Sequence, residues 1–367
     1  MIKEMRVGVF GGSFDPVHTG HLMLAEAALV RAGLDRVLFM PTYIQPFKRN
    51  VRTSSADDRI RMLALAIRGN PRFGISTVET DRDEVSYTIL SLRALKEELA
   101  PEGVPVFIVG TDMFLMIEQW YSAAELLREF DLVVGVRPGG RQGEAEGQAA
   151  RLRKKYGTRI DLIDNPPVEV SSTEIRAKIA AGESIRSLVP EEVRRFLLVR
   201  EREGERRFAH TKRVIDLAVR MARRFGADEE KARLAALLHD LAKDPAGGAE
   251  NNIRHGALAA EIARREFRVA DADVLNAIRY HTTGRAGMSK LELIIFLADT
   301  VEPGRTYDSI DRLRGMCLED LEKGALTVLI ELKAYLQKNG FEAAADTEAA
   351  IAELREKAGL REKQEGK

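Results

Sequence analysis

Histidine is the residue type whose placement says most about chemistry in this 367-residue chain. All six histidines fall into two groups: His18 and His21 lie within GGSFDPVHTGH, whereas His210, His239, His255 and His281 are spread through the second half. Imidazole binds both phosphate groups and metal ions near neutral pH. The partition therefore predicts two separate active sites, one in each half of the chain.

The first group follows an apolar run that ends at Phe10. The pattern predicts a strand, a sharp glycine turn and a helix from near His21 to Gly33. Backbone amides at the turn and at the helix start would then face one anion. We expect this turn to hold a triphosphate and both imidazoles to face it, rather than to be packing residues. The turn residues are Gly11, Gly12, Ser13 and Phe14.

Neither a Walker-type loop nor a dinucleotide GxGxxG turn is present in this segment. A second anion site is predicted at Ser171, Ser172 and Thr173, which open a helix that carries Arg176 in its first turns. An ordinary capped helix is the alternative. Asp112 follows the run VFIVG and is expected at the carboxyl edge of a sheet, where open α/β folds bind ligands.

The second group combines the four later histidines with two carboxylates. His239 and Asp240 are adjacent within the apolar segment LAALLHDLAK, where burying both is costly unless they are paired or bound to metal. Imidazole and carboxylate ligands without thiolate suit iron, manganese or magnesium better than structural zinc. A buried His–Asp hydrogen bond is the alternative. The predicted metal ligands are His210, His239, Asp240, His255, His281 and Asp299.

Two kinds of element must position these groups. Up to about residue 185, β-branched runs alternate with helical stretches, which predicts an α/β fold with a parallel sheet covered by helices on both faces. From about Arg206 onward, apolar residues recur every three to four positions, which predicts an all-α helical bundle. We place the boundary near Glu203, with domains at 1–200 and 205–350. Residues 139–148 are expected to form a glycine-rich loop.

Composition limits the class of protein. A length of 367 residues favours two domains, because single cores seldom exceed about 250–300 residues. The 57 basic residues equal the 57 acidic ones, so we expect neither nucleic acid nor a membrane as partner. The only cysteine, Cys317, and the absence of a signal peptide predict a cytoplasmic protein with a buried, inert thiol. Whether it forms a homo-oligomer is left open.

The motifs GGSFDPVHTGH, VGTD (109–112) and VSSTEIR (170–176) resemble the nucleotidyltransferase superfamily. Within it, PTYIQPFK (41–48), VSYTILSLRAL (85–95) and EQWY (118–121) resemble bacterial nicotinate-mononucleotide adenylyltransferases. This resemblance implies a Rossmann-like fold and transfer of AMP from ATP, with Mg²⁺, to nicotinate mononucleotide. Lys48 matches a family position, but the histidine that usually precedes that lysine is Phe47 here.

The resemblance also assigns residues to each part of the reaction. It implies that His18, His21, Lys48 and Arg176 stabilise the reacting phosphates, and that Gly110 and Asp112 join the turn residues and Ser171–Thr173 in binding ATP. Tyr87, Thr88 and Trp120 would line the pyridine pocket, although Trp120 could instead be ordinary packing. An adenylyltransferase with a different phosphate acceptor is the alternative.

In the second half, HDLAK, RYHTTGRAGM and LADTVEPGR resemble HD-domain hydrolases that cut diadenosine tetraphosphate symmetrically into two ADP. The resemblance implies two divalent metals, with iron expected and Asp240 bridging them as a catalytic residue. Lys243 and Arg305 would bind the polyphosphate, the alternative being solvated surface cations. A broad nucleotidase or a module that senses nucleotides without cleaving them are the other hypotheses. The intact ligand set argues against the sensing module.

Overall fold

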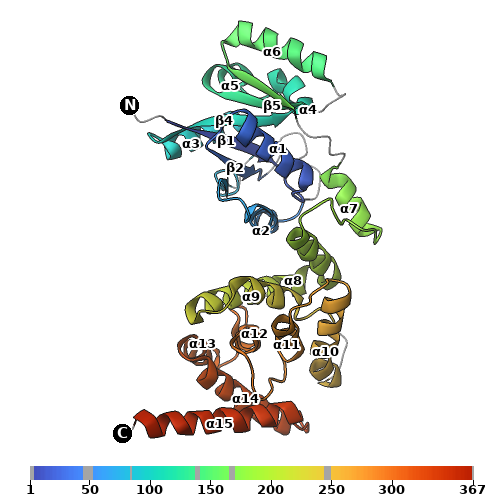
Figure 1. Ribbon diagram of the computed structural model, residues 1–367, viewed down its shortest axis with the longest axis vertical. Helices are drawn as coiled ribbons and strands as arrows, with labels where there is room; N and C mark the ends of the chain where they lie inside the picture. Colours follow the sequence, from blue (N-terminus) through green and yellow to red (C-terminus); the bar gives the residue numbers. More distant parts are fainter. Residues whose placement is uncertain are drawn as a thin grey trace. The chain divides into compact units, whose positions relative to one another are not determined.

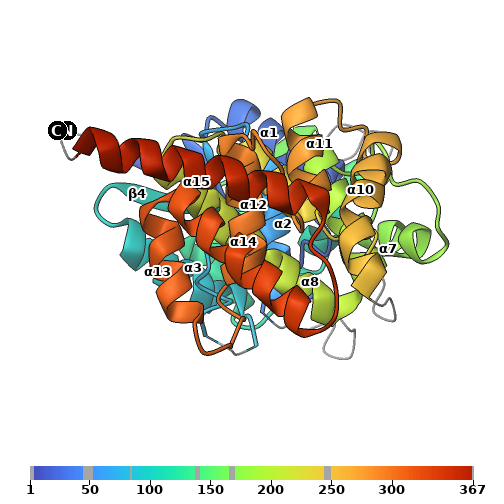
Figure 2. The same ribbon diagram turned by 90° about the horizontal axis from the view of Figure 1, so that it is seen from below.

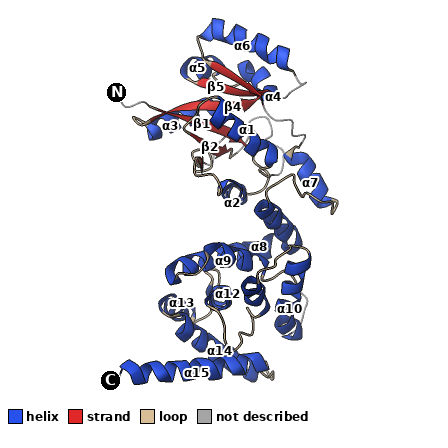
Figure 3. Cartoon of the chain, viewed as in Figure 1, coloured by secondary structure: helices blue, strands red, loops and turns tan. Residues whose placement is uncertain are grey.

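The computed structural model describes residues 4–43, 53–82, 85–136, 141–164, 170–243 and 249–365. The chain forms two compact units, Met1–Arg195 and Phe196–Lys367. In Figure 1 the first unit runs from blue to green and the second from yellow-green to red. The predicted α/β half followed by an all-helical half is confirmed. Figure 3 shows strands in the first unit and helices alone in the described part of the second.

A six-stranded parallel sheet forms the centre of the first unit. Its order is β3-β2-β1-β4-β5-β6, so the direction of strand addition reverses between β1 and β4. All six strands coincide with apolar runs rich in β-branched residues, as a sheet buried on both faces requires. The strands are β1 (Met5–Gly12), β2 (Arg36–Pro41), β3 (Phe73–Ile75), β4 (Gly103–Gly110), β5 (Asp131–Val136) and β6 (Ile160–Asp164).

Helices lie on both faces of this sheet (Figure 1). Buried residues of α3, α5 and α6 share one core with Val7 and Val9 of β1. On the opposite face, Leu24 of α1 lies so close to Gly135 of β5 that a β-carbon there would overlap its Cδ1. The helices of this unit are α1 (Thr19–Arg31), α2 (Ala56–Ile67), α3 (Thr88–Leu99), α4 (Thr111–Leu115), the 3₁₀ helix η2 (Ile117–Gln119), α5 (Ala123–Glu129), α6 (Gln142–Tyr156) and α7 (Ser172–Ala180).

The predicted loop at 139–148 is wrong from Gln142 onward, because α6 begins there. Two glycines and the high polarity of this segment suggested a loop. The helix forms nevertheless because Ala145, Ala149 and Leu152 recur on one face and are fully buried against the core of the sheet. Tertiary packing therefore outweighs the low helix propensity of Gly143 and Gly147.

The second unit consists of helices packed around α12, which is buried along most of its length. The long helix α15 lies against α14, as Figure 2 shows. The helical bundle predicted from about Arg206 onward is confirmed in the described residues. These helices are α8 (Glu191–Phe225), α9 (Glu229–Leu238), α10 (Ala249–Arg265), α11 (Ala272–Arg279), α12 (Lys290–Val301), α13 (Ile310–Glu319), α14 (Leu321–Lys338) and α15 (Ala345–Glu365).

The helix α8 carries the chain from the first unit into the second. The division between the compact units falls within it, between Arg195 and Phe196. At Gly204 the helix is interrupted by φ +70° and ψ +170°, a left-handed φ that favours glycine. This interruption lies beside Glu203, where the sequence predicts the domain boundary. The bounds of the two catalytic domains, 1–200 and 205–350, stay predictions.

Two further sequence expectations concern apolar segments and the thiol. Among the described residues, no helix combines the length and the apolar character needed to cross a bilayer. Cys317 in α13 is buried, and this burial raises the pKa of its thiol to about 12. Its neighbour across the helix pair is Gly324 of α14, where a β-carbon would lie 3.0 Å from the sulfur. Cys317 is therefore a packing residue with little thiolate character.

Candidate active sites in the two units

The first candidate site lies where β1 ends and α1 begins, beside the reversal of the strand order. Such a reversal opens a crevice at the carboxyl edge of a parallel sheet. Phe14, in the turn, has φ +49°, and the helix starts at Thr19, two residues before the sequence predicts. His18 is the N-cap and His21 the third helical residue, and their rings stack with centroids 3.6 Å apart.

The hydrogen bonding of His21 fixes which of its nitrogens can donate. The backbone amide of His18 donates to Nδ1 of His21 at 3.2 Å, so a neutral His21 carries its proton on Nε2. Burial, with a smaller contribution from His18, holds the pKa of His21 well below its usual value. His21 is thus a neutral hydrogen-bond donor near neutral pH, which suits an oxygen of a phosphate group.

The start of α7 packs against the same turn. Ser171 caps α7 by accepting a hydrogen bond from the amide of Glu174 at 3.1 Å. Ser172 donates its hydroxyl to the carbonyl of Pro16 at 2.9 Å. The glycine-rich turn and the SSTEIR segment, remote from each other in the sequence, therefore lie side by side and bring two helix N-termini together.

Arg176 joins these two helix starts. Its Nη1 donates to the carbonyl of Asp15 at 2.5 Å and lies 3.9 Å from the carboxylate of the same residue. Its Nη2 donates to the hydroxyl of Thr173 at 3.3 Å. The guanidinium stays partly exposed beside the turn. The structure thus brings Arg176 and Thr173 to the loop that carries His18 and His21.

Gly110 and Asp112 lie at the carboxyl end of β4, the strand next to β1. Gly110 ends β4 and precedes the short helix α4, which contains Asp112. The carboxylate of Asp112 is 78% exposed and lies 4.0 Å from Nη1 of Arg141. Because β1 and β4 are neighbours at the reversal point, both residues face the crevice edge that the turn residues line.

The predicted pyridine-side residues lie at the N-terminus of α3 and after η2. Tyr87 is the N-cap of α3, which starts at Thr88, and its ring lies 4.6 Å from that of Tyr121. Trp120 packs edge-on against Phe107, with centroids 5.9 Å apart, at the border of the core. Its buried Nε1 has no hydrogen-bond partner among the described residues. Lys48 lies outside the described residues.

Sequence reasoning missed the polar residues beneath the turn. Arg59 of α2 is 2% exposed and donates to the carbonyls of Ser13 at 2.9 Å and Ser54 at 3.2 Å. Asp15, also 2% exposed, accepts a hydrogen bond from the amide of Ser54 at 3.1 Å. These buried hydrogen bonds connect the turn to α2 and to the residues just before it. An arginine within an amphipathic helix gives no sequence signal for such a role, whereas Asp15 lies within the motif itself.

The second candidate site is formed by five helices of the second unit and the turns that follow them. The structure brings all six predicted metal ligands together. Nε2 of His255 and Nε2 of His281 lie 3.2 and 3.5 Å from Oδ1 of Asp240, and Nε2 of His239 lies 3.6 Å from the same oxygen. Their positions are His210 on α8, His239 and Asp240 after α9, His255 on α10, His281 after α11 and Asp299 on α12.

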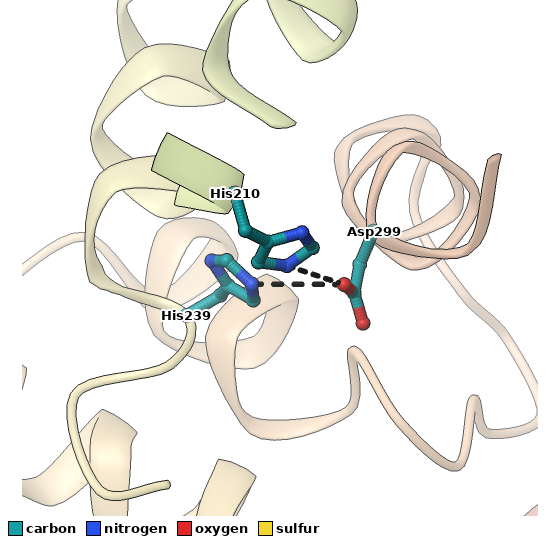
Figure 4. Close-up of side chains that lie close together, drawn as sticks. All are labelled: His210, His239 and Asp299. Atoms are coloured by element: carbon teal, nitrogen blue, oxygen red, sulfur yellow. Dashed lines mark ion pairs between the residues drawn. The ribbon is translucent and has the colours of Figure 1, made fainter. Parts of the chain in front are cut away.

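Five of the six residues form two groups that share His239, and His255 lies beside the second group, at Asp240. One contains His210, His239 and Asp299, and the other contains His239, Asp240 and His281, with all atoms of a group within 4.8 Å of one another. Figure 4 shows the first group, in which Oδ1 of Asp299 lies 3.0 Å from Nε2 of His210 and 3.9 Å from Nε2 of His239. Two adjacent metal ions sharing this cluster of donors would match this arrangement.

The buried polar atoms at the centre fit a metal. Nε2 of His239 and Oδ1 of Asp240 are inaccessible to solvent and have no hydrogen-bond partner in the described parts of the chain. Burial lowers the pKa of His239 to about 4, so its imidazole is neutral, as a metal ligand must be. Burial acts to raise the pKa of Asp240, but the facing imidazoles outweigh it and hold that pKa well below its usual value.

Lys243 and Arg305 lie at the edge of this cluster rather than on a free surface. Nζ of Lys243 donates to Oδ2 of Asp240 at 3.0 Å, and Nη2 of Arg305 donates to Oδ1 of Asp299 at 2.9 Å. The two side chains are 28% and 38% exposed. Both cations are thus paired with carboxylates of the cluster, and their binding of polyphosphate stays a prediction. Each presents a cation beside a predicted metal ligand.

Two carboxylates near the cluster escaped sequence reasoning. Glu302 is 1% exposed, and its Oε1 lies 3.1 Å from Nδ1 of His210. Glu203 accepts a hydrogen bond from Thr211 at 2.7 Å, and burial raises the pKa of its carboxyl group to about 7. The spacing of Glu302 three residues after Asp299 was a usable signal, because such residues share one side of a helix end. Glu203 carried no comparable signal.

Comparison with known proteins defines the class of each unit. A Cytidylyltransferase-like family model matches residues 9–178, and an HD domain model matches residues 207–304. The chain is thus a nucleotidyltransferase-type α/β unit followed by an HD-type helical unit. A protein of Thermoanaerobacter sp. (strain X514), named as a probable nicotinate-nucleotide adenylyltransferase, is 38% identical over 197 residues, which cover 54% of this chain and 93% of that protein.

A similarly named protein of Rubrobacter xylanophilus is 41% identical over 201 residues, which cover 53% of this chain and 91% of that protein. The chain belongs, through its first unit, to the nicotinate-nucleotide adenylyltransferase family. For the second unit, a crystal structure from Clostridium acetobutylicum, described as a predicted HD superfamily hydrolase involved in NAD metabolism, is 34% identical. That match covers 45% of this chain and 96% of that one, with a TM-score of 0.42.

Proposed function

We propose that the chain is a bifunctional enzyme. Residues 1–200 transfer AMP from ATP to nicotinate mononucleotide, giving deamido-NAD and pyrophosphate. Residues 205–350 hydrolyse dinucleoside polyphosphates such as diadenosine tetraphosphate to two ADP at a dinuclear metal site. Family membership supports the first activity, and the convergence of six nitrogen and oxygen donors in an HD domain supports the second.

The observation that carries the transferase proposal is the meeting of two helix N-termini at one turn. The start of α1 supplies His18 and His21, and the start of α7 supplies Ser171–Thr173 and Arg176. A polyphosphate bound there would meet backbone amides, two imidazoles and a guanidinium from opposite sides.

In the proposed reaction, an oxygen of the mononucleotide phosphate forms a bond to the α-phosphorus of ATP. The bond from that phosphorus to the oxygen bridging to the β-phosphate breaks, and pyrophosphate leaves with Mg²⁺, which arrives with ATP. The attacking phosphate is already ionised, so a general base is not needed. His21 donates its Nε2–H, and Arg176 and Lys48 neutralise the charge that develops on the phosphates.

Acceptor choice would depend on the pyridine side. Tyr87 and Thr88 stand at the N-terminus of α3, where free amides and the positive end of the helix favour a carboxylate. A nicotinate carboxylate has this charge, whereas a nicotinamide amide does not. Trp120, whose Nε1 has no hydrogen-bond partner among the described residues, and the Tyr87–Tyr121 pair would supply aromatic surface for the pyridine ring. These features support nicotinate mononucleotide over nicotinamide mononucleotide as the acceptor.

The observation that carries the hydrolase proposal is the pair of buried, unpartnered ligand atoms on His239 and Asp240. Two divalent ions, for which we propose iron, would be held by His210, His239, Asp240, His255, His281 and Asp299, with Asp240 as the catalytic carboxylate. Bound metal of this kind lowers the pKa of water and neutralises phosphate charge. Water adds to one central phosphorus of the tetraphosphate, the central P–O bond breaks, and two ADP leave. Lys243 and Arg305 face the phosphate oxygens.

Product analysis tests both activities on the full chain. One reaction contains ATP, Mg²⁺ and nicotinate mononucleotide, with nicotinamide mononucleotide and phosphopantetheine as competing acceptors. The other contains diadenosine tetraphosphate with ferrous or manganous ion. We expect deamido-NAD and pyrophosphate from the first and ADP alone from the second. Faster transfer to another acceptor would contradict the first assignment. AMP plus ATP, broad cleavage of mononucleotides, or binding without cleavage would contradict the second.

A further inference from the structure

A buried carboxylate lies behind the metal cluster, on the side away from the predicted ligand atoms. Glu302 follows α12 directly and is 1% exposed. Its Oε1 lies 3.1 Å from Nδ1 of His210, the ring nitrogen opposite the one that faces Asp299. Since a carboxylate can only accept, Nδ1 of His210 must be the donor in this contact. The lone pair of a neutral His210 is then on Nε2, toward the cluster.

The other two imidazoles with a defined Nδ1 contact use the backbone instead. Nδ1 of His239 donates to the carbonyl of Ala236 at 2.8 Å, and Nδ1 of His281 donates to the carbonyl of Ile278 at 2.7 Å. Both carbonyls lie one turn earlier on the same element. His210 lies inside α8, in the part that follows the interruption at Gly204, where main-chain carbonyls are used by the helix itself. Its Nδ1 therefore depends on a side chain from another element.

Glu302 is itself held in place by a guanidinium. Nε of Arg213 donates to Oε2 at 2.6 Å and Nη2 donates to Oε1 at 3.3 Å, while the amide of Gly304 donates to Oε2. A β-carbon at residue 304 would come within 2.5 Å of the Arg213 guanidinium, so glycine is needed for this approach. The negative charge that Glu302 brings into the interior is thus balanced before it meets His210.

We infer that Glu302 is a positioning residue of the metal site, which fixes the tautomer and the ring orientation of His210 so that Nε2 faces the metal. This inference rests on the proposed metal centre. Hydrogen bonds of this kind to the second ring nitrogen raise the basicity of a histidine ligand, and their loss commonly costs about 10–100-fold in metal affinity. Arg213 does not contact His210 in this scheme, but it orients the carboxylate of Glu302.

The chain offers a matched control for this test. Glu292, on the same helix α12, is 2% exposed and is likewise held by a guanidinium, with Nε and Nη2 of Arg285 at 2.7 and 2.6 Å. Within the described residues, its other side-chain contact is with Ser289, not with a metal ligand. E302Q and E292Q therefore remove the same charge from equivalent burial, and only E302Q touches a ligand.

The experiment is a titration of the chelator-treated full chain with Mn²⁺. Binding is measured by calorimetry and, independently, by the paramagnetic resonance signal of free Mn²⁺. Wild type should bind two ions. E302Q should bind one of them about 10–100-fold more weakly, and E292Q should keep both affinities even if the thermal midpoints of the two variants fall equally. E302A, which offers no acceptor to Nδ1, should weaken the same ion further.

Two results would overturn the inference alone: E302Q with both wild-type affinities, or equal weakening in E302Q and E292Q. In either case the loss of one ion in H210A would leave the metal centre standing. If wild type bound no Mn²⁺, or if H210A kept both ions, the proposed metal centre and the positioning role would both be wrong. The conservative E302Q variant keeps the test meaningful even where E302A fails to fold.

Discussion

At the scale of single residues, the two sites use histidine with opposite hydrogen-bonding polarity at Nε2. In the first unit, Nδ1 of His21 accepts an amide hydrogen, which leaves Nε2–H as a donor. In the second unit, Nδ1 of His239 and Nδ1 of His281 donate to carbonyls, which leaves Nε2 as an acceptor. A phosphate oxygen needs a donor and a metal ion needs a lone pair. The partner of Nδ1 therefore decides which ligand each imidazole suits.

This polarity predicts the behaviour of His21 variants. H21A should lower kcat for adenylyl transfer by about 10²–10³-fold, the usual cost of losing one donor to a developing oxyanion. H21Q should lose less, because the glutamine amide nitrogen can replace Nε2–H. Steady-state kinetics with ATP and nicotinate mononucleotide measure both, and metal-dependent hydrolysis by the same preparations is the control. Equal loss in H21A and H21Q would contradict a donor role.

Glu203 predicts a pH dependence of stability. Its pKa is raised from 4.5 to about 7, chiefly by burial, so the folded state favours the protonated carboxyl. The stabilising contribution of the protonated form is complete below about pH 4.5 and is lost as pH rises toward 7. E203Q imitates the protonated form and should not show this decline. Relative to wild type, it should gain of the order of 2 kcal/mol between pH 5 and pH 8.

Thermal unfolding of the full chain at each pH measures this difference in stability. The chain is first treated with a chelator, because bound divalent cations would lower the pKa of a nearby carboxyl group. E203D would keep a titrating group at the same position and serves as the comparison. If the difference in unfolding free energy between E203Q and wild type stayed constant from pH 5 to pH 8, the carboxyl group of Glu203 would not titrate in this range, and the raised pKa would be wrong.

The sequence predicted the direct metal ligands but not the residues behind them, for a physical reason. His239 and Asp240 stand out because an ionisable pair in an apolar helix must have a partner. Glu302 contacts His210 only because α8 packs beside the end of α12, and its spacing from Asp299 is the one local sign of this. Glu203 is an ordinary glutamate in a polar stretch, and nothing in the local pattern indicates its burial.

At the scale of elements, local propensity was a good guide to strands and a poor one to α6. Runs such as VFIVG are β-branched and apolar, so propensity and burial agree. In α6 they disagree, since Gly143 and Gly147 disfavour a helix while Ala145, Ala149 and Leu152 require one to reach the core. Burial of the apolar face decides the outcome.

The helix α6 therefore offers a test on its exposed face. A β-carbon at Gly147 would have no neighbour within 4 Å, and the residue has no left-handed φ, so G147A should stabilise the first unit by about 0.5–1 kcal/mol. Gly157, at the end of α6 with φ +73°, should respond in the opposite sense, with G157A costing about 1 kcal/mol. Urea unfolding followed by far-ultraviolet circular dichroism measures both changes. Destabilisation by G147A would argue against a helix there.

The contact between α1 and β5 gives a second test of the element packing. A methyl group at residue 135 would overlap Cδ1 of Leu24, so G135A should displace α1 and cost about 1–3 kcal/mol. The double variant G135A/L24A should recover part of this loss by making room. The same unfolding measurement applies, and additive losses in the double variant would show that the two residues are not in contact.

At the scale of the whole molecule, the two sites share no residue. Every predicted phosphate-binding side chain of the transferase precedes Arg195, and every predicted metal ligand follows Phe196. Because the predicted residues of each site belong to one compact unit, each activity should survive loss of the other. This separation was visible in the sequence from the grouping of the histidines alone.

Asp240 tests the separation in the full chain. D240A removes the carboxylate that three imidazoles face, so it should abolish polyphosphate hydrolysis and reduce the metal content measured by elemental analysis. Adenylyl transfer should keep its wild-type kcat and KM. A variant that retained two ions per chain would contradict the ligand assignment, and parallel loss of transfer would contradict separate sites.

Trp120 gives the molecule one further property. It is the only tryptophan in 367 residues and is one of the residues proposed to line the pyridine side of the first unit. Intrinsic fluorescence excited near the indole absorption band therefore originates from that unit alone, and its emission should be quenched or shifted when a pyridine nucleotide binds. The helical unit is optically silent at the same wavelength, so occupancy of one site can be followed in real time while the other turns over.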